Sequence, residues 1–192
     1  MTTLIFDTET AGLINFTDPS DYPSQPHIVD IACSLFDGAG LEIDRFDAII
    51  NPGVEIPADV AAIHGITTEI AQAEGIDPLV ALKRFEAITA EADVIVGHNV
   101  SFDIRMVRIL SARMTGFKWE PSTDTFCTMR RTTNICRILK KNPRTINDWK
   151  WPTLGEATKF FFNEDLPNAH RARPDCDAAA RIYFHLKEQG LA

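Results

Sequence analysis

Short runs of alternating hydrophobic and polar residues mark the N-terminal part of the chain. Hydrophobic residues from Thr3 to Phe6 predict one strand, and the alternation from Val29 to Leu35 predicts a second. The turn sequence Asp37-Gly38 predicts a hairpin into a third strand, whose hydrophobic phase changes and therefore needs a bulge near Asp44 or Arg45. Antiparallel pairing of these strands is the expected start of a sheet.

Helical periodicity follows the three strands. The segment from Ala58 to Ala90 is predicted to be helical, with breaks at His64-Gly65 and at Gly75. A short apolar run from Asp93 to Val96 predicts another strand, and helical spacing resumes near Ser101. Antiparallel strands followed by strands that alternate with helices indicate an α/β domain with a mixed sheet.

The C-terminal part of the chain is patterned less evenly. Leu154 to Phe162 and Pro174 to Gln189 are predicted helices, whereas the mixed stretch from Phe117 to Trp151 defines no element. At 192 residues the chain has the size of one domain, and residues 1–192 are expected to form it.

Composition narrows the class of protein. Hydrophobic residues make up 45% of the chain and charged residues 24%, as in ordinary soluble domains. No apolar run approaches the roughly 20 residues that span a bilayer, and the N-terminus lacks the pattern of a secretion signal. A cytoplasmic location without membrane contact is therefore expected. The cysteines are scattered, so reduced thiols are expected rather than zinc ligands or disulfides. They are Cys33, Cys127, Cys136 and Cys176.

Charge is distributed unevenly along the chain. The formal net charge of −8 argues against a protein that holds nucleic acid by its overall electrostatics. The segment from Arg130 to Lys150, however, contains seven basic residues and one acid, Asp148. This segment could contact a phosphate backbone or form a solvated face. Trp149 and Trp151 could stack on bases, although core packing is the favoured interpretation.

Acidic residues stand at unusual places in two predicted elements. In the sequence FDTET, the alternation of a strand should project Asp7 and Glu9 from one face, with their carboxylates close enough to repel. In GHNVSFD, Asp103 should lie in the first turn of a helix, where the helix dipole alone would also favour an acid.

The last predicted helix carries a further acid. The spacing of Asp175 to the apolar residues of this helix places it on the side that faces the sheet. Asp177 should instead be exposed and form an ion pair with Arg181. His170 can approach the same centre as Asp175 only from the loop before the helix, which Pro174 is expected to begin.

Four converging carboxylates would be costly without compensating charge. Divalent cations remove this cost, because oxygen ligands favour Mg²⁺ or Mn²⁺. Two such ions roughly 4 Å apart can act on the attacking and the leaving oxygen of a phosphodiester. The paired acids of the first strand would then be shared between two metal ions.

Three motifs together resemble those of a known family. FDTET, GHNVSFD and the H-x-A-x-x-D spacing from His170 to Asp175 resemble the motifs of the DEDDh group of DnaQ-like 3′→5′ exonucleases, which includes polymerase proofreading subunits and ribonuclease T. IHGIT, at Ile63 to Thr67, resembles another segment of this family. The resemblance covers essentially the whole chain. It implies a ribonuclease H-like three-layer domain with a central mixed five-stranded sheet flanked by helices.

The resemblance also implies roles for five residues. Asp7, Glu9, Asp103 and Asp175 would be catalytic ligands of two Mg²⁺ or Mn²⁺ ions, and His170 would be the general base that deprotonates a metal-bound water. The enzyme would hydrolyse phosphodiester bonds at single-stranded 3′ ends of DNA or RNA and release nucleoside 5′-monophosphates.

Four further residues would contact the substrate by resemblance, namely Thr10, Leu13, His64 and Phe102. For Thr10 and Leu13, a turn with a core leucine is the open alternative. The helical spacing of Phe102 favours a core position. His64 could instead cap a turn.

Other functions and partners stay open. An oligoribonuclease-like or RNA-trimming exonuclease is one alternative. An oligonucleotide hydrolase that clears very short fragments would suit the net acidity, because small substrates need few phosphate contacts. A largely non-catalytic polymerase-associated subunit would keep the same fold. A DNA polymerase or a second copy of the chain is a possible partner. Arg173 and Pro174 replace the aliphatic residues of many relatives, so the helix of Asp175 could start differently here.

Overall fold

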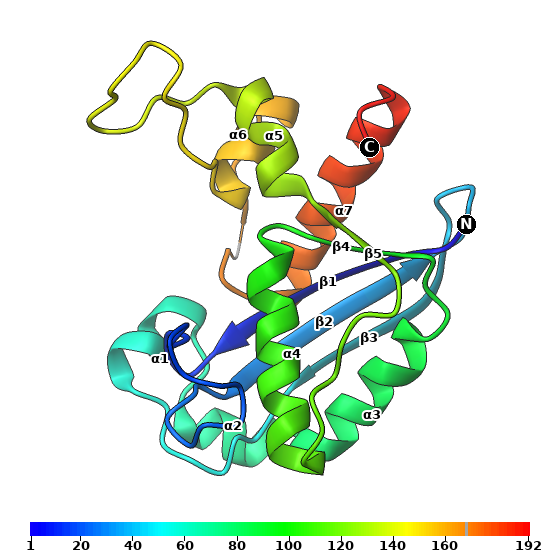
Figure 1. Cartoon of the computed structure of the whole chain (residues 1–192). Helices are drawn as coiled ribbons and strands as arrows, with labels where there is room; N and C mark the ends of the chain where they lie inside the picture. The colour runs from blue at the N-terminus through cyan, green and yellow to red at the C-terminus, as the bar shows by residue number, and fades with distance from the viewer. Residues whose placement is uncertain (168) are drawn as a thin grey trace.

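A mixed five-stranded sheet forms the centre of the fold, in the order β3-β2-β1-β4-β5, which confirms the predicted fold class (Figure 1). The computed structural model describes residues 1–167 and 169–192. The strands β1, β2 and β3 are antiparallel neighbours, whereas β4 and β5 run parallel to β1. The carboxyl ends of β1, β4 and β5 therefore lie at one edge of the sheet. The strands are β1 (Thr3–Thr10), β2 (Ile28–Phe36), β3 (Glu42–Ile49), β4 (Val94–Gly97) and β5 (Asp124–Cys127).

Helices in the described part of the chain flank this sheet. The predicted helical region from Ala58 to Ala90 divides at the two predicted breaks, and Gly65 ends the first helix with φ 76°, a left-handed conformation that glycine adopts without strain. None of the described helices is long and apolar enough to cross a membrane. The helices are α1 (Ala58–His64), α2 (Thr68–Glu74), α3 (Pro78–Thr89), α4 (Val100–Thr115), α5 (Thr128–Cys136), α6 (Leu154–Phe162) and α7 (Ala172–Glu188).

Alternate residues of β1 face two apolar layers. Leu4 and Phe6 are buried with α3 and α4, and the ring centroids of Phe6 and Phe85 are 5.0 Å apart. Ile5 lies on the other face and is buried with Cys176 and other residues of α7. Figure 1 shows α3 and α4 lying across one face of the sheet. The sheet is thus the middle of three layers, and residues two apart on β1 face the same helix layer.

Several boundaries differ from the sequence pattern. The strand predicted from Thr3 to Phe6 continues to Thr10, because β2 pairs along its whole length. Leu35 and Phe36 pair with Asp44 and Glu42, so the predicted bulge lies directly before Asp44.

Two elements lie in the stretch from Phe117 to Trp151, which the pattern left undefined. The strand β5 has only 4 residues, all partly or fully exposed, and α5 has a polar sequence, so neither shows a clear apolar period. The helix α7 begins at Ala172 rather than at Pro174. Proline is tolerated there because the first-turn N–H groups of a helix have no intrahelical partner.

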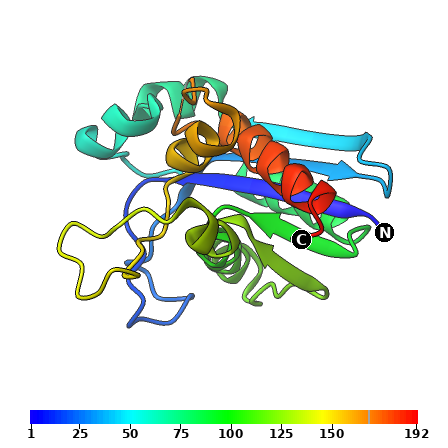
Figure 2. The ribbon, with the colours of Figure 1, turned by 90° about the horizontal axis from the view of Figure 1, so that it is seen from above.

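The chain between α5 and α6 leaves the body of the molecule as a long loop. We call residues 137–152 the basic arm. Its two sides are held together by backbone hydrogen bonds from Lys150 N to the carbonyl of Ile138 (2.8 Å) and from Lys140 N to the carbonyl of Asp148 (3.1 Å). In both views the arm projects on the side of the molecule where β1 ends (yellow in Figures 1 and 2).

Candidate active site

Two acids lie within β1 near its carboxyl end. Asp7 and Glu9 share the face of Ile5, which α7 covers, and they pair across to Ala32 and Asp30 of β2. Because β1 continues through Thr10, its regular alternation holds both carboxylates on the same face. The proximity of the two acids is therefore a direct product of the strand.

A third acid reaches the same centre from α4. Asp103 lies in the first turn of this helix and is 2% exposed. Its Oδ1 accepts hydrogen bonds from the backbone N–H of Thr8 (3.0 Å) and from the Thr8 hydroxyl (2.8 Å). The Asp103 carboxylate is thus bound to β1, so a role limited to the helix dipole does not describe it.

The fourth acid comes from α7. Asp175 is 8% exposed, and its Oδ2 accepts the backbone N–H of His170 at 3.1 Å. Its buried Oδ1 has no hydrogen-bond partner among the described residues. His170 is exposed and has a left-handed φ of 68°. Single ligand atoms of Glu9, His170 and Asp175 lie within 4.8 Å of one another.

Burial disfavours the ionisation of the four carboxyl groups, and repulsion between neighbouring carboxylates adds to this effect at Asp7, Glu9 and Asp103. Burial, followed by the nearby charges of Asp103, Asp175 and Glu9, raises the pKa of Asp7 well above its usual range. Burial and the charge of Asp175 raise the pKa of Glu9 to about 8, and burial raises the pKa of Asp103 to about 7. Burial also raises the pKa of Asp175.

This donor set fits a hard divalent cation. No salt bridge in the described ranges joins any of the four carboxylates to a lysine or arginine. The unpartnered Oδ1 of Asp175 is a buried acceptor without a donor. Oxygen ligands of this kind, with a nearby imidazole, suit ions of the Mg²⁺ and Mn²⁺ class.

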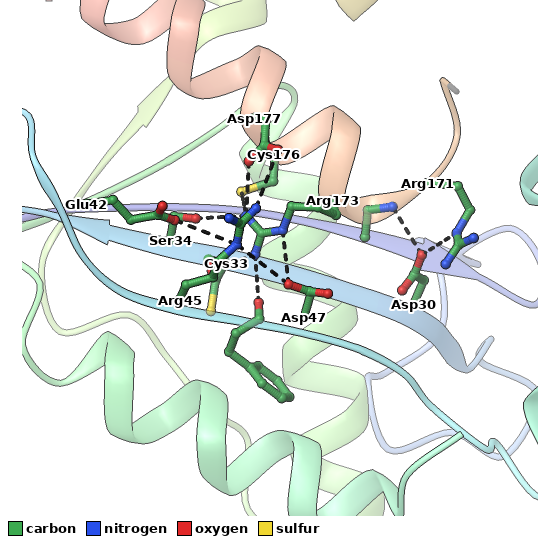
Figure 3. A network of polar contacts seen from close by, with 12 residues as sticks. Asp30, Cys33, Ser34, Glu42, Arg45, Asp47, Arg171, Arg173, Cys176 and Asp177 are labelled. Carbon is green, nitrogen blue, oxygen red and sulfur yellow. Dashed lines mark hydrogen bonds and ion pairs between the residues drawn. The ribbon is translucent and has the colours of Figure 1, made fainter. Parts of the chain in front are cut away.

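One buried acid beside the site was missed by sequence reasoning. Asp30, 4% exposed, lies opposite Glu9 on β2. It accepts hydrogen bonds from Arg171 Nε (2.8 Å) and from the backbone N–H of Ala172 (3.2 Å), as Figure 3 shows. An acid inside the apolar run IVDIACSLF was the available signal. Its position opposite Glu9 depends on strand register, which the sequence does not reveal.

Arg173 fixes the start of α7 to the sheet. Its guanidinium donates to the carbonyls of Cys33 and Phe46, both at 2.9 Å, and to Ser34 Oγ at 2.8 Å (Figure 3). It also bridges to Asp177 at 3.1 Å. The residue that departs from the aliphatic family pattern is therefore an anchor on β2 and β3.

The predicted ion pair of Asp177 with Arg181 is wrong. Asp177 pairs with Arg173 and, at 3.6 Å, with Arg45 of β3. Arg181 instead contacts Glu164 at 2.8 Å. The helix spacing permitted the predicted pair, but the charges of β3 and of the loop before α7 offer these side chains other partners.

The residues expected to contact substrate differ in their exposure. Leu13 is 92% exposed, so it is not a core leucine. The Thr10 hydroxyl donates to the carbonyl of Gly12 at 2.7 Å and holds the turn that carries Leu13. Phe102 is partly buried against the apolar layer of α3 and α4.

His64 has one ring nitrogen engaged and one available. The residue is 4% exposed, and its Nδ1 accepts the backbone N–H of Ile66 at 3.1 Å. Its Nε2 has no hydrogen-bond partner among the described residues. Burial lowers the pKa of His64 and so favours the neutral ring. Because Nδ1 accepts a hydrogen bond, the neutral ring carries its proton on Nε2. His64 lines a hollow of about 710 Å³ together with Asp30 and Arg171.

Comparison with known proteins agrees with this geometry. The exonuclease family model named RNase_T matches residues 4–183. DNA polymerase III PolC-type of Listeria welshimeri is 34% identical over 183 residues, which are 95% of this chain and 11% of that protein. An uncharacterized exonuclease, CP81 of Escherichia phage 186, is 27% identical over 198 residues, with 98% of this chain and 90% of the phage protein covered.

A solved structure shares the fold. The crystal structure of E. coli exonuclease I in complex with a dT13 oligonucleotide matches with a TM-score of 0.72 and 20% identity, over 97% of this chain and 41% of that one. The chain thus spans less than half of exonuclease I and about a tenth of the polymerase relatives. Since the family model covers nearly the whole sequence and the motif acids meet at one edge of the sheet, the chain belongs to the RNase_T exonuclease family, in the DEDDh group of DnaQ-like exonucleases.

Proposed function

We propose that the protein is a 3′→5′ exonuclease that uses two Mg²⁺ or Mn²⁺ ions, acts on single-stranded 3′ ends and releases nucleoside 5′-monophosphates. The observation that carries this proposal is the meeting of four buried or half-buried carboxyl groups from β1, α4 and α7 beside an exposed histidine. A purely structural role would not need a cluster that raises the pKa of its own members.

The residues of the site would have different roles in the reaction. Asp7, Glu9, Asp103 and Asp175 would hold the metal ions, which when bound would supply positive charge to the phosphate and make water a better nucleophile. His170 accepts the proton of the attacking water, because its loop position leaves the ring exposed beside Glu9 and Asp175. The hydrogen bond from His170 N to Asp175 keeps the base and this ligand in one geometry.

Three of the predicted substrate contacts would hold the terminal nucleotide. His64 would donate from Nε2 to an oxygen of the terminal nucleotide, because this nitrogen has no hydrogen-bond partner of good geometry within the described chain. Leu13 packs on the terminal nucleotide from the turn that Thr10 stabilises, and its nearly complete exposure leaves it free to do so. Phe102 contributes its exposed part from the first turn of α4.

The relatives favour DNA as the substrate. The exonuclease I structure contains an oligothymidylate, and several sequence relatives are DNA polymerases, which also supports a polymerase as a partner. An oligonucleotide hydrolase for very short RNA or DNA remains the second candidate, supported by the net charge of −8.

Degradation of 5′-labelled single-stranded DNA and RNA tests the proposal. Wild type is compared with Asp7→Asn and with Asp124→Asn, which removes an exposed carboxylate at the start of β5, away from the carboxyl ends of the strands. With Mg²⁺ or Mn²⁺ we expect wild type to give a ladder of products that shortens from the 3′ end, and EDTA should abolish it. The Asp124→Asn variant should give the same ladder, and the Asp7→Asn variant should give none.

The same assay distinguishes the alternatives. Cleavage of dinucleotides without cleavage of either polymer would replace the proposal by the oligonucleotide hydrolase. Unchanged cleavage by Asp7→Asn would remove the carboxylate cluster from the mechanism. No hydrolysis of any substrate by wild type would favour a non-catalytic role.

A further inference from the structure

The seven basic residues between Arg130 and Lys150 lie on α5 and on the basic arm. Two of them are neutralised, because Lys140 pairs with Asp148 and Lys150 pairs with Glu156. The remaining five have no carboxylate partner in the described chain, and all are exposed. These five are Arg130, Arg131, Arg137, Lys141 and Arg144. An acidic protein therefore presents a local group of unpaired cations.

Two surface hollows lie beside three of these cations, and the first of them reaches α4. The first, about 450 Å³, is lined by Ser101 of α4 and by Arg130, Arg131 and Asn134 of α5. The second, about 380 Å³, is also lined by Asn134 and continues along the arm. Ser101 lies in the first turn of α4, the turn that also carries Asp103. The two hollows share Asn134, and we call their combined lining, from the first turn of α4 to the arm, the basic track.

A half-buried histidine fixes the track to the sheet. His98, at the carboxyl end of β4, donates from Nε2 to the carbonyl of Pro152 at 2.9 Å, and its Nδ1 lies 2.9 Å from the hydroxyl of Thr128. Burial lowers the pKa of His98, which favours this neutral arrangement. The start of α5 and the end of the arm are therefore held at the edge of the sheet where the catalytic acids lie.

Exposed apolar side chains accompany the cations. Trp151 is 62% exposed and Ile146 is 84% exposed, so the expectation of core packing for Trp151 is wrong. Trp149 lines the second hollow with Arg137. Cations interleaved with aromatic side chains are typical of surfaces that bind single strands, where phosphates contact the cations and bases stack on the rings.

We propose that the basic track binds the single strand several nucleotides upstream of the 3′ end that lies in the active site. This inference rests on the proposed function for the placement of the 3′ end. It assigns the protein to long single strands rather than to dinucleotides, because only a strand that extends beyond α4 can reach the arm.

Binding without cleavage tests the track. Fluorescence anisotropy of labelled oligothymidylates, from about 4 to about 24 nucleotides, is measured in EDTA at KCl concentrations from about 50 to about 200 mM. The double variant Arg130→Gln/Arg137→Gln, which removes one cation from each hollow, is compared with Lys83→Gln/Lys187→Gln, which removes two exposed or half-exposed charges from α3 and from the end of α7.

Wild-type affinity should rise with strand length until the track is filled. The track variant should bind long strands about tenfold more weakly at low salt, with a salt dependence shallower by about 1.4 in log–log slope, and should bind the shortest strands nearly as wild type does. The Lys83→Gln/Lys187→Gln control should follow wild type.

The proposed role of the basic track would be overturned if both double variants lost the same affinity for long strands. It would also be overturned if the affinity of wild type did not depend on strand length. Because no hydrolysis is measured, this result is independent of the exonuclease assay. Hydrolysis of polymers without length-dependent binding would leave the proposed function in place and remove the track alone.

Discussion

At the scale of single residues, the backbone of His170 is as informative as its ring. Its φ of 68° lies in the left-handed region, which costs an ordinary side chain about 1 kcal/mol and which asparagine tolerates well. The strained turn points the imidazole toward Glu9 and Asp175 from outside α7. A substitution that keeps this backbone conformation therefore separates the chemistry of the ring from the shape of the loop.

We expect His170→Asn to lower kcat by about 10²- to 10⁴-fold, because the proposed general base is lost while the turn is kept. Its affinity for Mn²⁺, measured by calorimetry on the metal-free protein, should stay within a few-fold of wild type. A loss of Mn²⁺ affinity as large as the loss of kcat would show that His170 is a ligand and not the base.

At the scale of elements, the start of α7 is held by polar contacts with two strands. Asp30 of β2 binds Arg171 and the N–H of Ala172, and Arg173 reaches carbonyl groups of β2 and β3. These contacts are made by residues between His170 and Asp175, so they set where both residues lie. The N-cap residue of α7 makes no side-chain hydrogen bond to the helix. Asp30 of β2 instead accepts the first-turn N–H of Ala172, as an N-cap side chain would.

We expect Asp30→Ala to lower kcat more than it raises KM, because it releases the start of α7 without touching the substrate. Asp30→Asn should keep more activity, since the amide oxygen can still accept the N–H of Ala172. Hydrogen exchange of the segment 169–176 should accelerate in the alanine variant. Unchanged exchange together with reduced kcat would point to a direct role of Asp30 in the reaction.

We expect Arg173→Leu, which restores the aliphatic type, to lower the free energy of unfolding by about 1 to 3 kcal/mol, because three acceptors lose their donor. Urea denaturation measures this change. Asp47→Asn is the matched control, since the exposed pair of Asp47 with Arg173 should contribute little. A variant as stable as wild type would show that the guanidinium does not anchor the helix.

The sequence predicted the elements whose apolar residues recur at a regular spacing. It also predicted the acids that stand where this spacing calls for an apolar residue. Asp7 and Glu9 stood out because they follow an apolar run, and Asp175 because it lies on an apolar helix face. Asp30 was missed because its place beside the site follows from the pairing of β2 with β1, which puts it opposite Glu9. The strand β5 was missed because it is short and partly exposed, so it carries almost no pattern. The local spacing of apolar residues carries no information on strand register or on long-range contacts.

At the scale of the whole molecule, the carboxyl cluster links stability to pH and metal. A carboxyl whose pKa is raised by folding binds its proton more tightly in the folded state than in the unfolded state. The cluster therefore stabilises the metal-free fold fully only below the ordinary carboxyl pKa of about 4. Its contribution is lost as the pH rises toward about 7 and about 8, where Asp103 and Glu9 ionise.

We expect Asp7→Asn to raise the Tm of the metal-free protein by about 3 °C or more at pH 8, because one member of the repelling cluster is gone. The gain should shrink toward pH 5, and Mn²⁺ should raise the Tm of wild type more than that of the variant. Differential scanning calorimetry in EDTA and in Mn²⁺ measures this, with Asp124→Asn as control. A variant less stable than wild type at pH 8 in EDTA would contradict the cluster's effect.

The uneven charge of the chain affects how a single-stranded nucleic acid would approach the protein. Seven cations and one acid give the segment from Arg130 to Lys150 a charge of +6, which leaves −14 for the rest of the molecule. Such a molecule is a strong electric dipole, and a polyanion that diffuses toward it is turned before it touches. Most of the surface repels it, and the basic arm draws it in. The net acidity that argues against tight binding would thus work as an orienting field, and it would keep the shortened strand from settling anywhere else.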